Sequence, residues 1–287
     1  MWKKVLAAGS AVFALGFLAP IDSGCSIVWS TASCEEGMQL KAPDGLEYST
    51  PLAYDSIVQR TELKHDDRVI MTGRTYEVEL AVQSARKFPK LQRALERLAT
   101  DNWAYMHKMM KYWEPDLVEQ YNARKADGWF SDGSTPPFCY ELKFSGLRAD
   151  TTVFSCVGEE FIFLGGAHPV TYYRGHVFDT KSGQELNLDD IFETTEGLAE
   201  IIVHETTAQC REQTKMIDKK ETVKKVQKMI DDHKLQYGMT EEALVVYFGS
   251  YAIGPYAMGT MEVKLPYTKY MNMFNNKYVF YGEKAKG

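Results

Sequence analysis

The sequence predicts an α+β fold, in which an antiparallel sheet packs against a pair of helices. Apolar and polar residues alternate with a period of two over 54–83, and a second block of predicted strands lies within 139–188. Helical spacing of apolar residues occupies separate stretches, at 90–125 and at 195–235. Strands and helices that come in such blocks favour α+β over a wound parallel sheet. We expect a smaller strand-plus-helix domain to precede the main sheet.

The composition is that of a folded globular protein. Of the 287 residues, 45% are hydrophobic and 25% are charged, and the formal net charge is −6. These values exclude collagen-like, low-complexity and disordered classes. No long basic run is present, so we do not expect a nucleic-acid partner.

The first 24 residues have the layout of a secretory signal peptide. Lys3 and Lys4 precede fifteen mostly apolar residues, Val5 to Ala19. A membrane-spanning helix needs about 20 apolar residues, and this run is shorter. We therefore expect export to the periplasm or the cell surface. Removal of residues 1–24 would leave 31 basic and 38 acidic residues and a net charge of −7.

Cys25 is the favoured attachment site for a lipid anchor. Two small residues precede it, as in bacterial lipoproteins, although Asp22 stands where an aliphatic residue is usual. Cys34 is a second candidate, and simple cleavage after Ala32 is a third alternative. We expect attachment to the membrane through the lipid alone, with residues 25–50 serving as a linker.

Residues 51–135 form the predicted N-terminal domain. Strands over 54–83 are followed by a helix over 90–125, in which Pro115 marks a break or a new helix start. The turn-rich stretch 128–137 is the best linker in the chain, so we place the domain boundary there.

Residues 136–280 form the predicted C-terminal domain. Lys181 to Gly183 supply a turn, and Asp190 with Glu193 is expected to cap a short helical turn. The expected elements are strands at 139–145, 151–164, 170–179 and 184–188, helices at 195–213 and 219–235, strands at 244–248 and 261–265, and a short helix at 267–274.

Most catalytic signatures are absent from the sequence. It contains no Walker loop and no G-x-G-x-x-G, C-x-x-C or G-x-S-x-G motif. His204 and Glu205 begin a zincin-like motif, but Ala208 stands where the second histidine ligand is needed. Ser84 and Lys87 match S-x-x-K without its companion motifs. We expect neither a metal nor a cofactor.

His168, His176 and Asp179 are the remaining candidates for a metal site. Eight residues of extended strand span about 26 Å, which is too far for one metal ion to bridge. Structural histidines are therefore the favoured interpretation. Convergence of the three side chains on one point would instead support a metal-dependent enzyme.

Two segments are candidate binding loops. Gly165 and Gly166 follow an apolar strand, where glycine permits positive φ or close backbone approach. Residues 251–259 carry two tyrosines and a proline between glycines, and aromatic residues on stiff loops are common interface anchors. The residue types alone favour a simpler interpretation, a plain bend and tyrosines packed on the sheet.

Both loops belong to motifs that resemble the RsiV-like extracellular domain family, long catalogued as a domain of unknown function. The order and separation of the motifs make the resemblance specific over about residues 139–274. Residues 54–137 weakly resemble the N-terminal part of the deacetylase PdaC, a domain that often precedes this family. The motifs are FIFLGGAH at 161–168, FDTKSGQELNLDDIF at 178–192, VYF at 246–248, PYAMG at 255–259 and EVKLPY at 262–267.

The resemblance implies a protein-binding module outside the cytoplasm rather than an enzyme. The family's best-understood member is a membrane-bound anti-sigma factor whose outer domain binds lysozyme through loops that reach the active-site cleft. Only four residues precede the apolar run here, so we expect no anti-sigma activity. The candidate partner-binding residues are Gly165, Gly166, Ala167, His168, Gly254, Pro255, Tyr256 and Ala257.

The acidic mature chain is compatible with a cationic partner such as lysozyme or another wall-associated protein. An envelope hydrolase or a peptidoglycan deacetylase-related enzyme is the alternative, and it would need a metal or a polar dyad. A structural envelope component without a soluble ligand is a third alternative.

The five cysteines form an odd set for an exported protein. Cys139 and Cys156 are equidistant from a hairpin centre between Leu147 and Arg148. Directly opposed residues are close enough for a disulfide, which we predict, with two buried free thiols as the alternative. A lipid on Cys25 would leave Cys34 and Cys210, the two cysteines that the sequence does not assign, either paired or free.

Overall fold

The computed structural model describes residues 40–43, 45–46, 48–126 and 137–282. The predicted signal peptide, Cys25, Cys34 and most of the predicted linker at 128–137 lie outside the described residues. These described residues belong to one compact unit.

The largest element is a five-stranded sheet with the order β1-β2-β3-β4-β5. All neighbouring strands are antiparallel except β2 and β3, which are parallel. The sheet therefore joins strands from both sides of the predicted domain boundary. The predicted α+β class is confirmed, with the parallel β2–β3 pair as the difference from a purely antiparallel sheet. The strands are β1 (Tyr54–His65), β2 (Arg68–Leu80), β3 (Phe138–Ala149), β4 (Val153–Phe163) and β5 (Val170–Asp179).

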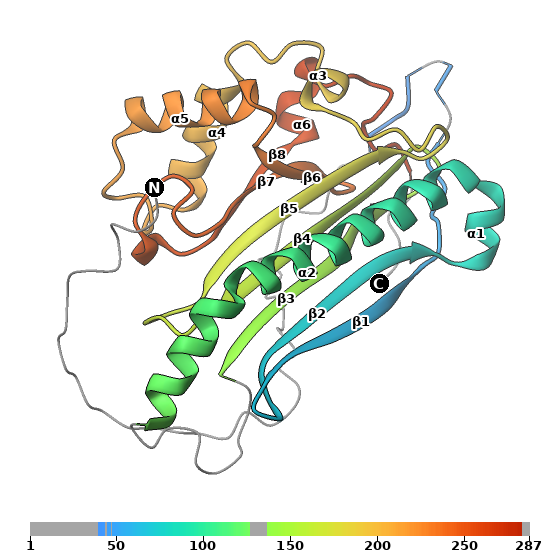
Figure 1. The fold of residues 1–287 in the computed structure, drawn as a ribbon. Helices are drawn as coiled ribbons and strands as arrows, with labels where there is room; N and C mark the ends of the chain where they lie inside the picture. Colours follow the sequence, from blue (N-terminus) through green and yellow to red (C-terminus); the bar gives the residue numbers. More distant parts are fainter. Residues whose placement is uncertain (1–39, 44, 47, 127–136, 283–287) are drawn as a thin grey trace. The chain divides into compact units, whose positions relative to one another are not determined.

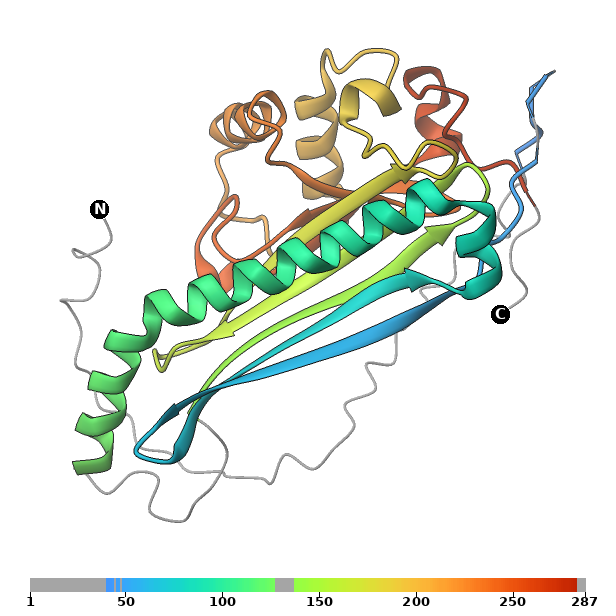
Figure 2. The ribbon, with the colours of Figure 1, turned by 45° about the vertical axis from the view of Figure 1, so that its right-hand side comes forward.

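A long helix covers one face of this sheet. After the short helix α1 (Val82–Lys87), α2 runs over Pro89–Ala126 and lies along the sheet (Figure 1). Its apolar face buries residues such as Leu91 and Met106 against the strands. Pro115 lies within the continuous helix, so the predicted break or new helix start at this residue is wrong. Proline removes a single backbone hydrogen bond and kinks a helix, and Figure 2 shows the last turns of α2 bending away from its main axis.

The opposite face of the sheet packs against a second layer. This layer has a three-stranded antiparallel sheet of order β6-β7-β8, together with the predicted helix pair, α4 and α5. Side chains of β4 alternate between two cores: Phe154 faces α2, whereas Val153 joins the core of the second layer. The elements are α3 (Leu188–Ile191), α4 (Leu198–Gln209), α5 (Lys219–Asp231), β6 (Gln236–Met239), β7 (Ala243–Phe248), η1 (Tyr256–Met258), β8 (Met261–Pro266), α6 (Tyr267–Tyr270) and η2 (Met271–Met273).

Glycine allows the two layers to approach closely. A Cβ atom built on Gly175 of β5 would lie 1.9 Å from the carbonyl oxygen of Tyr237 in β6. The Gly175 amide donates to the side-chain oxygen of Gln236 at 3.0 Å, and the Met239 amide donates to Ser155 Oγ at 2.9 Å. These contacts fix β6 across the face of the larger sheet.

The predicted disulfide is wrong because the β3–β4 hairpin has a different register. Cys139 lies opposite Phe163, and Cys156 lies opposite Gly146. Seven residues of strand, about 23 Å, therefore separate the two rungs that the cysteines occupy. Cys139, Cys156 and Cys210 are all free thiols.

The hairpin turns at Asp150 rather than between Leu147 and Arg148. The Asp150 carboxylate accepts hydrogen bonds from the amides of Thr152 and Val153 at 2.7 and 2.9 Å, an arrangement that stabilises a turn. Gly146 lies within β3 at a register shift.

Two further predicted elements differ in detail. Residues 184–188 do not form a strand, and only an isolated bridge pairs Phe178 with Glu185. The capping box of α3 consists of Asn187 and Asp190, so this helical turn begins before Asp190 rather than after it.

Candidate functional site

The two loops named from the sequence contact each other. The ring of His168, from the loop between β4 and β5, stacks on the ring of Tyr256, from the loop between β7 and β8. The ring centroids are 3.6 Å apart and the ring planes differ by 14°. A single exposed surface therefore receives residues from both segments.

Helix α2 holds the first loop in place. Gly165 has a φ of 84°, and its carbonyl oxygen accepts a hydrogen bond from the Arg124 guanidinium. A Cβ atom at this position would lie 2.7 Å from the ring of Phe138. The expectation that glycine is needed here for its backbone freedom is confirmed. Gly166 to His168 are exposed beyond this anchor.

Two buried side chains hold the second loop in place. Ile253 and Met258 insert into the core of the second layer, while Pro255 and Ala257 are exposed between them. Tyr256 begins the short helix η1 and is half-buried. The loop thus presents its aromatic side chain from a fixed backbone, which lowers the entropy lost on contact with a partner.

A reciprocal pair of hydrogen bonds joins the second loop to β5. The Ser250 amide donates to the Thr171 carbonyl at 2.8 Å, and the Thr171 amide donates to Ser250 Oγ at 3.3 Å. The loop therefore cannot move independently of the strand that follows the first loop.

Tyr251 belongs to the same surface, although the sequence did not single it out from its segment. Its side chain is 55% exposed, its backbone has a φ of 65°, and its ring centroid lies 5.6 Å from that of Tyr256. A positive φ in a tyrosine is uncommon and marks a position held by its surroundings. Sequence alone carries no signal for such a backbone angle.

Tyr172 and Tyr105 extend the surface along β5 towards α2. Both are about 40% exposed. Burial raises the pKa of Tyr172, with further contributions from Glu160, Tyr105 and Tyr251. We call His168, Tyr256, Tyr251, Tyr172 and Tyr105 the aromatic surface.

A partly buried ion pair supports the α2 end of the aromatic surface. The Arg174 guanidinium lies 4.4 Å from the centroid of the Tyr105 ring and donates to both carboxylate oxygens of Glu160, at 3.1 and 2.7 Å. Tyr140 donates to the same carboxylate at 2.7 Å. Burial, together with the adjacent Glu160 carboxylate, raises the pKa of the Tyr140 hydroxyl, which therefore stays protonated.

Acidic groups lie on the other face of β5. Tyr173 packs on Tyr247 with ring centroids 5.1 Å apart, and Glu159 and Glu262 lie beside this pair. Burial raises the pKa of Glu262, against a lowering effect of Lys264 and with a further raising contribution from Glu159. The face next to the second loop therefore carries two acidic groups, with Lys264 beside them.

The candidate metal ligands do not come together. His176 pairs with Glu185 at 2.6 Å, and Asp179 pairs with Lys277 at 2.7 Å. His168 lies in the first loop, before β5 begins at Val170. Within the described residues, no group of three His, Cys, Asp or Glu side chains is placed to hold a metal ion.

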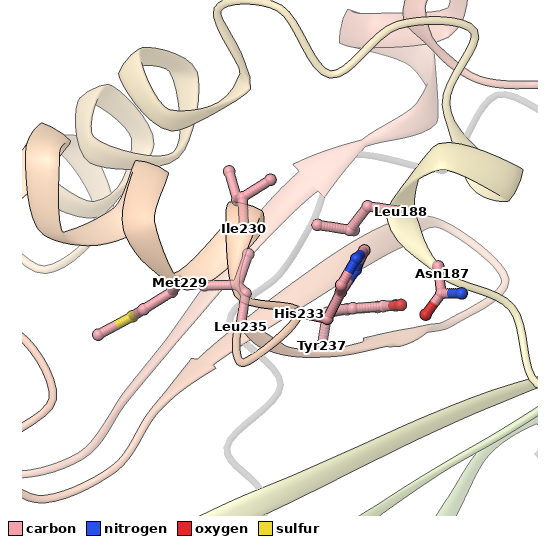
Figure 3. A pocket seen from close by; sticks show the side chains of 7 residues that line it. All are labelled: Asn187, Leu188, Met229, Ile230, His233, Leu235 and Tyr237. Carbon is pink, nitrogen blue, oxygen red and sulfur yellow. The ribbon is translucent and has the colours of Figure 1, made fainter.

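A small cavity lies elsewhere, between α5 and the start of β6 (Figure 3). Its volume is about 30 Å³, enough for about one water molecule. Tyr237 lines it and donates its hydroxyl hydrogen to the Leu186 carbonyl at 2.8 Å. The size excludes an organic ligand in this cavity. The lining residues are Asn187, Leu188, Met229, Ile230, His233, Leu235 and Tyr237.

None of the helices in the described part of the chain combines the length and the apolar character needed to cross a membrane. The predicted lipid attachment lies outside that part.

Comparisons with known proteins identify a domain without an assigned function. Residues 189–268 match a family described as "Protein of unknown function (DUF3298)", a range that includes the second loop but not the first. A search of curated proteins finds no significant match.

Two crystal structures of proteins from this family resemble the chain. One, from Bacteroides fragilis NCTC 9343, is 17% identical, with a TM-score of 0.54 and coverage of 79% of this chain and 95% of its own. The other, from Pseudomonas aeruginosa PAO1, is 15% identical, with a TM-score of 0.48 and coverage of 82% and 99%. The first shares the fold. The RsiV-like and PdaC-like assignments stay predictions. Residues 189–268 thus resemble the DUF3298 family, and the chain shares the α+β fold of the first structure.

Proposed function

We propose that this chain is a protein-binding module of the cell envelope and that the aromatic surface is its contact site. The stacking of His168 on Tyr256 is the observation that carries the proposal, because it joins the two loops into one exposed surface. Tyrosine supplies a large contact area with few rotatable bonds, and such residues dominate binding energy in many interfaces.

A cationic protein is the partner whose chemistry fits best. Residues 165–169 and 251–259 carry no charged side chain, while Glu159 and Glu262 lie on the adjoining face. The chain is acidic overall, and opposite charges accelerate association between proteins. Lysozyme is the cationic protein that the RsiV-like resemblance implies, and we propose it as the partner.

Isothermal calorimetry with lysozyme tests this proposal. The wild-type protein should bind, and Tyr256→Ala and His168→Ala should each weaken binding by about 10- to 30-fold, as expected for residues at the centre of an interface. Tyr48→Ala is the matched control, because Tyr48 is an exposed tyrosine at the opposite end of the large sheet. It should bind like the wild type.

Two results would contradict the proposal in different ways. No heat from the wild-type protein would exclude lysozyme as the partner. Binding that is equally tight in the Tyr256→Ala and His168→Ala variants would exclude the aromatic surface as the contact site.

Export with lipid attachment at Cys25 is part of the same proposal. It can be tested by mass spectrometry of the protein recovered from cell envelopes. A chain that begins at Cys25 and carries the added mass of a lipid is expected. A chain that begins at Met1 or Ser33 would contradict it.

A further inference from the structure

The outer edge of β1 is unpaired in the described part of the chain. The Ala81 amide donates to the Ala53 carbonyl at 3.0 Å, and these two residues continue the β1–β2 register. Hydrogen-bonded pairs alternate along an antiparallel ladder, so odd-numbered residues of β1 bond to β2. Even-numbered residues, including Val58, Arg60 and Glu62, direct their backbone groups outwards. Figure 1 and Figure 2 both show β1 as the outermost strand.

The side chains of β1 combine apolar and charged character. Tyr54, Ile57 and Val58 are 40%, 39% and 43% exposed, and they lie on both faces of the strand. Aromatic and β-branched residues are enriched in β-strands, where they pack against cross-strand neighbours. A long exposed edge of this kind is a template for pairing with another strand.

A row of charged side chains on one face of the sheet ends at this edge with an arginine whose neighbour in the row has the same charge. Arg60 of β1 lies directly opposite Arg74 of β2, and Arg74 lies opposite Glu141 of β3. Like charges at directly opposed positions destabilise a sheet. A carboxylate on the outer side of Arg60 would relieve this repulsion. Within the described residues, Glu62 forms an exposed ion pair with Lys64 at 3.5 Å, and no acidic side chain forms an ion pair with Arg60.

We propose that a second copy of this chain pairs with β1, strand to strand and antiparallel, about a twofold axis at Thr61. This register places Arg60 opposite Glu62 of the second copy, and Glu62 opposite its Arg60. Both residues belong to the outward-facing set, so their backbone groups can exchange hydrogen bonds directly. The two five-stranded sheets then form one continuous sheet of ten strands, which is within the natural range.

The charge pattern selects this arrangement over the alternatives. Because the interface is isologous, each opposite-charge pair occurs twice. A parallel arrangement in register would place Arg60 beside Arg60 and Glu62 beside Glu62, which is repulsive. The proposed dimer is independent of the aromatic surface, because β1 and β5 are the two opposite edges of the sheet.

A charge-swap experiment tests the dimer. The mass of the purified full chain is measured by sedimentation velocity over a range of concentrations. The wild type should form a dimer, and Glu62→Arg and Arg60→Glu should each weaken it by at least about tenfold, because both symmetric pairs become repulsive. The double variant Arg60→Glu/Glu62→Arg restores opposite charges and should restore the dimer.

The control variant is Glu196→Arg, which makes the same change of charge at an exposed position before α4. It should leave the dimer unchanged. A wild-type protein that is monomeric at every concentration would overturn the proposal. So would a dimer that Glu62→Arg does not weaken, or a double variant that folds but stays monomeric.

Hydrogen exchange gives a second measurement on the wild type that does not depend on a variant folding. The amides of Val58, Arg60 and Glu62 should exchange more slowly as the protein concentration rises. The amides of Ile57 and Thr61 bond to β2 in either state and should not respond. Exchange rates that do not change with protein concentration in either set of amides would contradict the pairing.

Discussion

The two edges of the five-stranded sheet are protected in opposite ways. At the β5 edge, backbone groups of Thr171, Gly175 and Val177 are satisfied by Ser250, Gln236 and Leu186, all from the C-terminal half of the chain. At the β1 edge, no described residue pairs with the outward-facing backbone groups. Tertiary contacts close the β5 edge, which we call the closed edge. The β1 edge, which we call the open edge, has only charged side chains or a partner strand to protect it from uncontrolled pairing.

The same contrast recurs beneath α2, in two buried carboxyl groups. Glu160, on the strand next to β5, is satisfied by Arg174 and Tyr140. Glu77, on the strand next to β1, receives only a hydrogen bond from Asn102 at 3.2 Å, and its second oxygen has no partner within the described residues. The buried carboxyl group near the closed edge therefore has partners for both oxygens, whereas the one near the open edge has a partner for only one of them within the described residues.

The largest effect is expected from opening the closed edge with Gly175→Val. The new side chain would overlap the backbone of Tyr237, which cannot rotate out of the way. Overpacking against rigid atoms should lower the free energy of unfolding by more than about 3 kcal/mol. Chemical denaturation would measure the loss.

Gly166→Ala is the matched control for this variant. A Cβ atom at Gly166 would meet its nearest neighbour at 3.9 Å, an ordinary contact, so stability should change by less than about 0.5 kcal/mol. Equal stability of the two variants would show that the close approach of β6 to β5 does not exist in solution.

The second prediction concerns pH and the buried carboxyl near the open edge. Burial raises the pKa of Glu77 from 4.5 to about 7, against the weaker lowering effects of Asn102 and Arg174. The folded state therefore favours the protonated acid. The stability that Glu77 contributes is fully present below pH 4.5 and is lost as the pH rises through 7.

Glu77→Gln, which keeps the shape but cannot ionise, should therefore be more stable than the wild type by about 3 kcal/mol above pH 7. The two proteins should converge at acidic pH. Denaturation curves over a pH series would measure the difference. Glu193→Gln, at an exposed position, should change stability by less than about 0.5 kcal/mol. A constant offset between Glu77→Gln and the wild type at every pH would contradict the raised pKa.

Local patterns predicted most elements because each depends on the period of its own residues. The apolar spacing of α2 continues across Pro115, and β7 and β8 are short apolar runs. In contrast, β6 has only four residues, two of them polar or glycine, so no period can be recognised. The predicted β3–β4 register was wrong because it was centred between Leu147 and Arg148 from the positions of Cys139 and Cys156, whereas Asp150 with two following threonines carries the turn chemistry.

The site could be predicted only in part. The sequence indicates both loops through their glycines and aromatic residues. The stacking of His168 on Tyr256 depends on how the second layer docks on β5, through contacts such as Ser250 with Thr171. These contacts join residues far apart in the chain, and no local pattern encodes them. Tyr105 enters the surface for the same reason, from the middle of α2.

A third prediction weakens the closed edge without overpacking. Ser250→Ala removes the acceptor for the Thr171 amide and leaves the reciprocal bond from the Ser250 amide intact. The loss should be about 1 kcal/mol, the usual net contribution of one hydrogen bond. It should also make the second loop more mobile, which faster hydrogen exchange at Ala252 would show. Unchanged exchange would mean that the main-chain bond alone holds the loop.

The smallest effect is expected at the open edge. The same substitution, valine to threonine, is made at both edges for comparison. Val177 of β5 is 1% exposed, and Val177→Thr would bury a hydroxyl among apolar side chains at a loss of about 1–3 kcal/mol. Val58 of β1 is 43% exposed, so Val58→Thr should change the free energy of unfolding by less than about 0.5 kcal/mol. This value applies at concentrations below dimer formation, and the comparison is then repeated at higher concentrations, where the second copy would cover Val58. A loss at Val58 that grows with protein concentration would indicate that the open edge is closed by pairing, whereas a large loss at every concentration would mean that another part of the same chain covers it.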